Sequence, residues 1–176
     1  MILHEKGLCR LLKQEHKKNG YVIVQEGSLT VIGVARMAVV MQSSEVPRQL
    51  LGLLVEHSGE VPKDCAIRVM DGVDNQTMLR DAGLGARTSV EDAFPAEHTA
   101  IIWDGCARVY QCQDGRVFAI EEKYLETVSG AAGDPVVDLE HEVAAWYGTD
   151  EEIYVPIVTK KENAHLAALE SHRWTL

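Results

Sequence analysis

Four cationic side chains near the N-terminus repeat at a spacing that places them on one face of a helix. They follow one another at intervals of four, three and four residues: Lys6, Arg10, Lys13 and Lys17. Leu8, Leu11 and Leu12 fall on the opposite side at about 100° per residue, which predicts an amphipathic helix over 3–18. Such a stripe can contact phosphates, because each lysine or arginine releases a condensed counterion. The alternative is the solvent face that any surface helix has.

Two polar clusters carry residue types that bind divalent cations. One is the run 138–142, which combines Asp, Glu and His, and the other is Glu162 with His165, an E-x-x-H pair on a predicted helix. Carboxylates with an imidazole can hold a metal ion, although di-iron sites need two E-x-x-H motifs and further glutamates. We interpret both clusters as solvated surface and predict no metal or cofactor. A metal-dependent domain using 138–142 or 162–172 is kept as a third hypothesis.

The other chemistry-bearing patterns are incomplete. The segment 82–86, Ala-Gly-Leu-Gly-Ala, has neither the lysine of a P-loop nor the G-x-G-x-x-G spacing, so it predicts a turn. The sequence contains no G-x-S-x-G elbow. A pairing of Cys106 with His98 stays open, because a nucleophile and its base meet in space rather than in sequence. No residue is therefore assigned as catalytic.

The composition is that of a globular protein with enough apolar material for a core. The 176 residues are 46% hydrophobic and 25% charged, which is ordinary, and the length suits a single domain, 1–176. The net charge is -10, yet residues 1–20 hold five lysine or arginine residues against two glutamates, a balance of +3. The rest of the chain therefore carries -13, and an acidic surface repels polyanions at long range.

Compartment and redox state follow from what the sequence contains. We read no signal peptide at the N-terminus and no stretch of 18 apolar residues, so we expect a cytoplasmic protein without a membrane partner. The four cysteines form no C-x-x-C pair and are expected to be reduced thiols. Cys106 and Cys112 are predicted to share one face of a strand as packing residues.

Two runs of predicted strands each end in a helix, as if one supersecondary unit were used twice. The first has strands at 21–24, 29–34 and 37–41 and a helix from Pro47, and the second has strands at 99–103, 107–112 and 116–120 and a helix near 121–128. Asn19-Gly20 is expected to end the first helix, and Asp104-Gly105 is a hairpin signal. The predicted fold is α+β: antiparallel β-meanders, internally repeated and covered by three or four helices. Two pseudo-repeats, about 3–70 and 71–176, are one interpretation.

The remaining segments are less regular. A strand is predicted at 65–70, and the stretch 73–98 is read as one or two strands plus a long loop. Residues 136–147 are ambiguous between helix and strand. A strand is predicted at 152–158, where Pro156 favours an edge position, and 160–174 is predicted to be a final helix.

This order of elements resembles one domain of a DNA sliding clamp. The meander 21–41 followed by Val46-Pro47 is similar to a clamp meander running into a helix that starts at a proline. The resemblance implies helices that carry basic residues toward DNA on an inner surface, and Lys6, Arg10, Lys13 and Lys17 would suit that face. Bacterial clamps have three such domains per chain, so the resemblance implies that a chain of this length surrounds DNA only as a homo-oligomer.

The sequence favours a non-enzymatic interaction domain that binds a protein or DNA partner and is clamp-like in its fold. The proposed contacts are Lys6, Arg10, Lys13 and Lys17. The alternative is a small enzyme whose site is assembled from dispersed residues near the 73–98 loop, because long loops often carry function.

Overall fold

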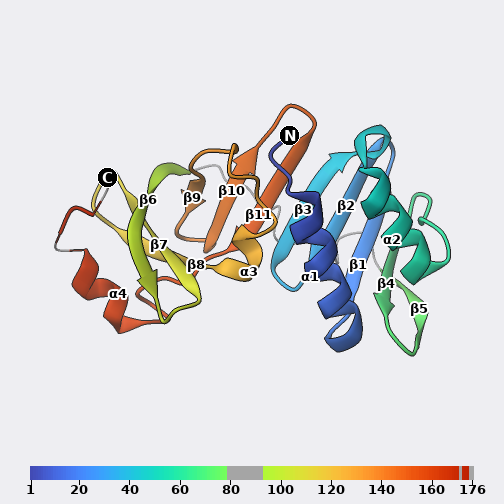
Figure 1. The fold of residues 1–176 in the computed structure, drawn as a ribbon, viewed down its shortest axis with the longest axis horizontal. Helices are drawn as coiled ribbons and strands as arrows, with labels where there is room; N and C mark the ends of the chain where they lie inside the picture. The colour runs from blue at the N-terminus through green and yellow to red at the C-terminus, as the bar shows by residue number, and fades with distance from the viewer. Residues whose placement is uncertain (79–92, 171, 175–176) are drawn as a thin grey trace.

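The computed structural model describes residues 1–78, 93–170 and 172–174, and within them eleven strands form one antiparallel sheet (Figure 1). The helices in this part of the chain are α1 (Glu5–Lys18), α2 (Arg48–Ser58), α3 (Glu122–Leu125) and α4 (Ala164–Leu169), with a short 3-10 helix, η1 (Ser43–Glu45). The strands are β1 (Tyr21–Glu26), β2 (Leu29–Val34), β3 (Met37–Gln42), β4 (Ala66–Met70), β5 (Val73–Met78), β6 (Phe94–Trp103), β7 (Ala107–Cys112), β8 (Val117–Glu121), β9 (Val136–Asp138), β10 (Val143–Tyr147) and β11 (Glu151–Pro156). The α+β class and the antiparallel meanders are confirmed.

The order of the strands shows two similar arrangements that meet at the centre of the sheet. From edge to edge it is β5-β4-β1-β2-β3-β11-β10-β9-β6-β7-β8. In one half β1, β2 and β3 form a meander with β4 beside β1, and in the other β6, β7 and β8 form a meander with β9 beside β6. The division into pseudo-repeats at about 3–70 and 71–176, within a single domain, stays a prediction.

β11 lies at the centre of the sheet, so the expectation of an edge strand is wrong. It pairs with β3 on one side and with β10 on the other. The Ile157 N–H donates to Glu142 O on the β10 side, so the nitrogen of Pro156 faces the side of β3. The β3 pairing ends at Tyr154, and no ladder partner there requires the N–H that proline lacks.

The central strands are buried on both faces. Ile23, Ile32 and Val39 belong to the main core beneath α1 and α2, whereas their neighbours Val24 and Val31 belong to a second cluster on the opposite face. The strand register places each set in a row across the sheet. Burial on both faces explains why these strands read as continuous apolar runs.

The helices cover the sheet only in part, so the expectation of a sheet covered by helices is not confirmed. α1 and α2 lie over the half that contains β1–β4, and α4 lies beside β7 and β8 at the other end (Figure 1). Leu166 of α4 packs with Val109 and Ala119, on the face opposite that of Tyr110 and Phe118. α1 and α2 therefore cover one face of the half that contains β1–β4, whereas α4 packs on the opposite face at the other end of the sheet.

The second half of the sheet curls back on itself. Just beyond β11, Val158 exchanges two backbone hydrogen bonds with Ala119 of β8, at 2.8 and 2.9 Å. The chain after the central strand therefore reaches the far end of the sheet. This curvature lets residues of β7, β8 and β10 share the main core with α1.

Several local predictions are corrected. Residues 136–147, left ambiguous, form β9 and β10, and the helix predicted at 160–174 is reduced to the six residues of α4. Cys106 lies exposed in the β6–β7 turn rather than on a strand with the buried Cys112. Residues 79–92 of the predicted loop, including the glycines at 82–86, lie outside the described residues. Among the described helices, none has the length and apolar character needed to cross a bilayer.

Gly7 provides a test of how closely α1 approaches the second half. A Cβ at Gly7 would lie 1.7 Å from the carbonyl oxygen of Glu126, which is backbone and has little room to move. Gly7→Ala should therefore lower the free energy of unfolding by roughly 1–3 kcal/mol, as overpacking does. Urea denaturation measures the loss.

Gly52→Ala is the matched control, because a Cβ on this helical glycine meets nothing within 4 Å. It should raise stability by about 0.5–1 kcal/mol, the ordinary gain of alanine over glycine in a helix. Equal effects of the two substitutions would contradict the close packing at Gly7.

Candidate functional site

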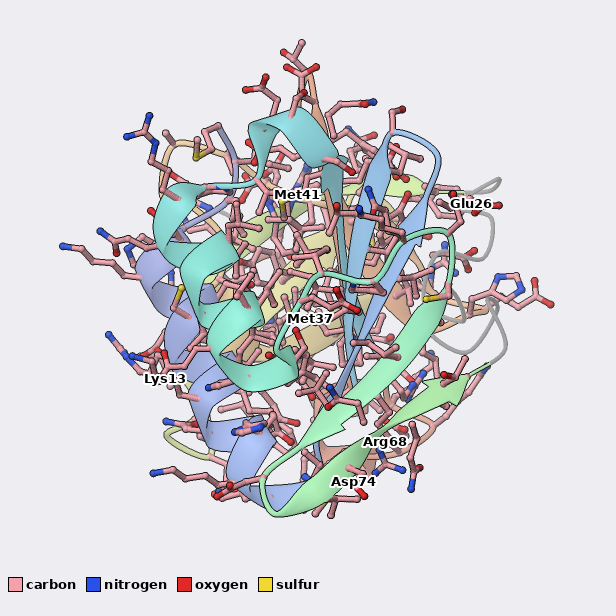
Figure 2. The ribbon with its side chains drawn as sticks, turned by 90° about the vertical axis from the view of Figure 1, so that its right-hand side faces the viewer. Lys13, Glu26, Met37, Met41, Arg68 and Asp74 are labelled. Carbon is pink, nitrogen blue, oxygen red and sulfur yellow. The ribbon has the colours of Figure 1, made fainter. Side chains whose placement is uncertain are left out.

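The exposed face of α1 carries all four predicted contact residues. Gly7, Leu8, Leu11 and Leu12 are buried against the core, as the amphipathic pattern predicts, so the opposite face points to solvent. That exposed face contains Lys6, Arg10, Lys13 and Lys17. Figure 2 shows Lys13 on α1, with its side chain directed away from the body of the protein. The structure thus places the four residues in one row and leaves their function open.

The four cations differ in their partners. Arg10 donates to Glu126 at 2.8 Å, and both side chains are about half exposed. Among the described residues, Lys6, Lys13 and Lys17 have no carboxylate within ion-pair distance. Lys17 lies in the last turn of α1, where a cation also favours the helix dipole. Three of the four charges are therefore available to a partner.

α1 is held firmly at its N-terminal end. The carboxylate of Glu5 accepts hydrogen bonds from the backbone N–H groups of Gln49 and Leu50, both at 3.1 Å. These donors open α2, whose own N-cap residue, Pro47, supplies no side-chain acceptor. The side chain of one helix thus caps its neighbour. On the other side, the His4 N–H donates to Thr127 O at 2.8 Å.

Two histidines and a tyrosine meet where α1 and α2 end. The rings of His16 and His57 stack with centroids 3.8 Å apart and planes 6° from parallel. His57 Nδ1 lies 2.9 Å from the hydroxyl of the buried Tyr21. Burial lowers the pKa of His57, and His16 and Lys13 lower it further, against the opposing effect of Glu56 and Asp71. The lone pairs of an imidazole lie in the plane of its ring, so two stacked, nearly parallel rings cannot both direct a nitrogen lone pair at one metal ion.

A cleft of about 380 Å³ opens between β6, β7, α3 and the loop before β9. His98 of β6 pairs across the ladder with Tyr110 of β7, and the His98 ring bonds to Asp134 Oδ1 at 2.9 Å. Arg108 lies two residues from Tyr110 and donates to Glu122 at 3.2 Å. The residues that line the cleft are His98, Arg108, Tyr110, Glu122, Leu125, Glu126, Val128, Ser129, Gly130, Gly133, Asp134 and Trp146.

The polar run 138–142 forms a local turn. The buried carboxylate of Asp138 accepts from the backbone N–H groups of Glu140 and His141, and His141 Nδ1 lies 2.7 Å away. Burial acts to raise the pKa of Asp138, but these hydrogen bonds outweigh it and the pKa is lowered. The hydrogen bond to Asp138 raises the pKa of His141. Asp138 and His141 thus satisfy each other.

The other candidate pairs are not assembled. Glu162 lies in the turn before α4 and approaches Arg36, so it does not share a helix with His165. His98 and Cys106 are separated along the β6–β7 hairpin, and His98 bonds to Asp134 instead. In the described residues, no three His, Cys, Asp or Glu side chains are grouped so that they could hold a metal ion.

Sequence reasoning missed the cleft. It noted His98 only as a partner for Cys106, whereas Asp134 lies 36 residues further along the chain and Trp146 comes from a segment whose structure was ambiguous. No spacing rule links residues that meet through long-range strand pairing. A local signal was present in the sequence Gly-Ala-Ala-Gly-Asp-Pro at 130–135, which is typical of a loop and supplies Asp134 and two glycines of the lining.

Removal of the Glu5 carboxylate should weaken the start of α2. Glu5→Ala leaves two N–H groups of α2 without their acceptor, and we expect a loss of about 1 kcal/mol in the free energy of unfolding. Glu5→Gln keeps an acceptor oxygen and should lose less. Glu56→Ala is the control, since the side chain of this exposed glutamate of α2 makes no hydrogen bond among the described residues. A loss of stability equal to that of Glu5→Ala would contradict the cap.

The lowered pKa of His57 makes stability depend on pH in a defined direction. Its pKa in the unfolded chain is near 6.5 and lies lower in the fold, so the unfolded state binds more protons as the pH falls below about 6.5. Stability should therefore decrease on acidification through this range. His57→Asn should lose less stability than the parent between pH 7.5 and pH 5 in urea denaturation. An identical pH dependence in both proteins would contradict this role.

Comparison with known proteins yields one structural likeness. The chain matches no protein-family model and no curated protein. It is similar to the crystal structure of a DNA polymerase III subunit beta sliding clamp from Bartonella birtlesii, with a TM-score of 0.28 and 11% sequence identity. The match covers 89% of this chain and 64% of the clamp chain, so this chain spans less than two thirds of the clamp's length. The likeness agrees with the resemblance seen in the sequence, and at this TM-score it carries no argument about function.

Proposed function

We propose that this protein is a non-enzymatic interaction domain whose α1 face binds a polyanionic partner, with DNA as the partner to test. The contacts are Lys6, Lys13 and Lys17, with Arg10 in a secondary role because Glu126 already neutralises it. The observation that carries the proposal is the row of three exposed lysines that lack a carboxylate partner among the described residues.

The dimensions of the stripe suit an extended row of phosphates. From Lys6 to Lys17 the helix rises about 16 Å, and over this length duplex DNA presents roughly nine phosphate charges. The three lysines on this helix face can each neutralise a phosphate and release its counterion, and this release is the main source of non-specific affinity for DNA. The stripe thus has the form of an electrostatic contact that does not read base sequence.

The anchoring of α1 supports the proposal. Glu5 ties the helix to α2, and Gly7 lets it approach the second half closely. A partner therefore meets cations whose backbone is already ordered, which reduces the entropy lost on binding. The lysine side chains still lose rotamer freedom.

The charge of the whole chain limits and orients this contact. Residues 1–20 carry a net +3 within a protein of net charge -10, so a polyanion is attracted to α1 and repelled by the rest of the surface. We therefore expect modest affinity and steep salt dependence. An acidic protein surface would satisfy the same cations, and a homo-oligomer that surrounds its partner, as in the clamp-like hypothesis, stays a prediction.

The enzyme hypothesis is favoured only by the position of His98. This residue belongs to the stretch 73–98 and meets Asp134 within the cleft. No nucleophile is within hydrogen-bond reach of His98 among the described residues, so a catalytic role lacks the partner that acyl transfer would require.

Charge reversal of the three lysines tests the proposal. The binding of a fluorescent DNA duplex of about 20 bp is measured by fluorescence anisotropy between 20 and 150 mM salt. The affinity should fall at least tenfold in the variant Lys6→Glu/Lys13→Glu/Lys17→Glu. The slope of log K against log salt should fall by about 2–3, because three phosphate contacts are lost. The variant should stay folded, since all three lysines are exposed.

A variant with the same change in net charge controls for repulsion by the whole molecule. Lys63→Glu/Lys161→Glu/Arg173→Glu alters three exposed cations on other segments and should keep most of the affinity and the salt slope. Equal losses of DNA affinity in the two variants would show that the effect comes from the net charge of the protein and not from the α1 stripe. Absence of DNA binding by the parent protein at 20 mM salt would overturn the DNA assignment.

A further inference from the structure

The cleft between β6, β7 and α3 contains a polar group that the protein itself leaves unused. Tyr110 is 6% exposed and lines the cleft, and its hydroxyl has no hydrogen-bond partner among the described residues. Every fully buried side-chain nitrogen or oxygen in the described part of the chain has a partner. The Tyr110 hydroxyl is therefore not fully buried, and the residue that carries it lines the cleft.

The charged groups around this hydroxyl are mainly acidic. Burial raises the pKa of Tyr110 most, Arg108 acts to lower it, and Asp134 and Glu122 act to raise it further, so charges of both signs act on the phenol. The lining holds three carboxylates against one arginine. When Arg10, the partner of Glu126, is also counted, the carboxylates still outnumber the arginines.

The carboxylates keep acceptor capacity in the cleft. Asp134 Oδ1 accepts a hydrogen bond from the backbone N–H of His98 and also lies 2.9 Å from Nδ1 of its ring. Glu122 Oε1 accepts a hydrogen bond from Arg108. The second oxygen of each has no hydrogen-bond partner among the described residues. These oxygens and the Tyr110 oxygen are acceptors of the kind that the N–H groups of an ammonium or guanidinium compound require.

We propose that this cleft binds a small organic cation, a primary amine or a guanidinium compound. The volume of about 380 Å³ suits a small metabolite, and the acidic surface of the chain attracts cations. An anion would meet Asp134, Glu122 and Glu126, while the one arginine of the lining is already held by Glu122. None of Lys6, Lys13 and Lys17 lines this cleft.

NMR titration of the ¹⁵N-labelled protein with putrescine tests the proposal, with succinate as a dianion of the same chain length at matched ionic strength. Putrescine should shift the amide signals of His98, Tyr110 and Asp134, and succinate should leave them unchanged. Equal shifts from succinate, or no shift at 10 mM putrescine, would overturn the proposal.

Two variants locate the contact. Tyr110→Phe keeps the ring that stacks on Phe118 at 5.5 Å and removes only the hydroxyl, so it should fold normally and bind putrescine roughly tenfold more weakly. Asp134→Asn should weaken binding similarly, whereas Asp74→Asn, an exposed aspartate on β5, should not. A variant with the three α1 lysines reversed should retain putrescine binding, so failure of this proposal is distinguishable from failure of the first. Equal weakening by Asp74→Asn and Tyr110→Phe would refute the site.

Discussion

Four residue pairs join β3 to β11, and through them the two halves of the sheet become one structure. The partners are more than 100 residues apart, and both strands are buried in their central residues. Closing so long a loop costs conformational entropy, which the burial of apolar side chains on both faces of the central strands offsets. Because β11 also pairs with β10 and its continuation bonds to β8, the curvature of the second half depends on the same strand.

α1 depends on this junction as well. It packs on the first half through its leucines and α2, and it touches the second half through Gly7, His4 and Arg10. Contacts with both halves therefore fix the position of the helix that carries the row of cations. Its exposed face carries no apolar packing, so the lysines there contribute little to stability and are free to serve a partner.

The cleft and the α1 stripe meet at one residue. Glu126 lines the cleft and also binds Arg10 of the stripe, while its own carbonyl oxygen lies 2.8 Å from His4 Nδ1 and faces Gly7. The two surfaces have opposite charge, one cationic and one mainly anionic, although they share this segment. Because an acidic cleft lies beside a basic helix, the net charge of the chain does not indicate the charge of either surface.

What the sequence determined by itself is the local structure. The spacing of Leu8, Leu11 and Leu12 and the stop at Asn19-Gly20 predicted α1, and Asp104-Gly105 predicted the β6–β7 hairpin, because periodicity and turn chemistry act over a few residues. The exposure of the four cations followed from the same amphipathic pattern.

Only the tertiary structure decided which strands are central and which distant residues meet. Pro156 suggested an edge, but β11 became the central strand because the proline falls past the end of β3. Tyr110, His98 and Asp134 were brought together by the β6–β7 register and by a loop 36 residues from His98. Strand pairing over such separations is selected by the burial of whole faces, and this free energy depends on the complete fold rather than on any local pattern of residues.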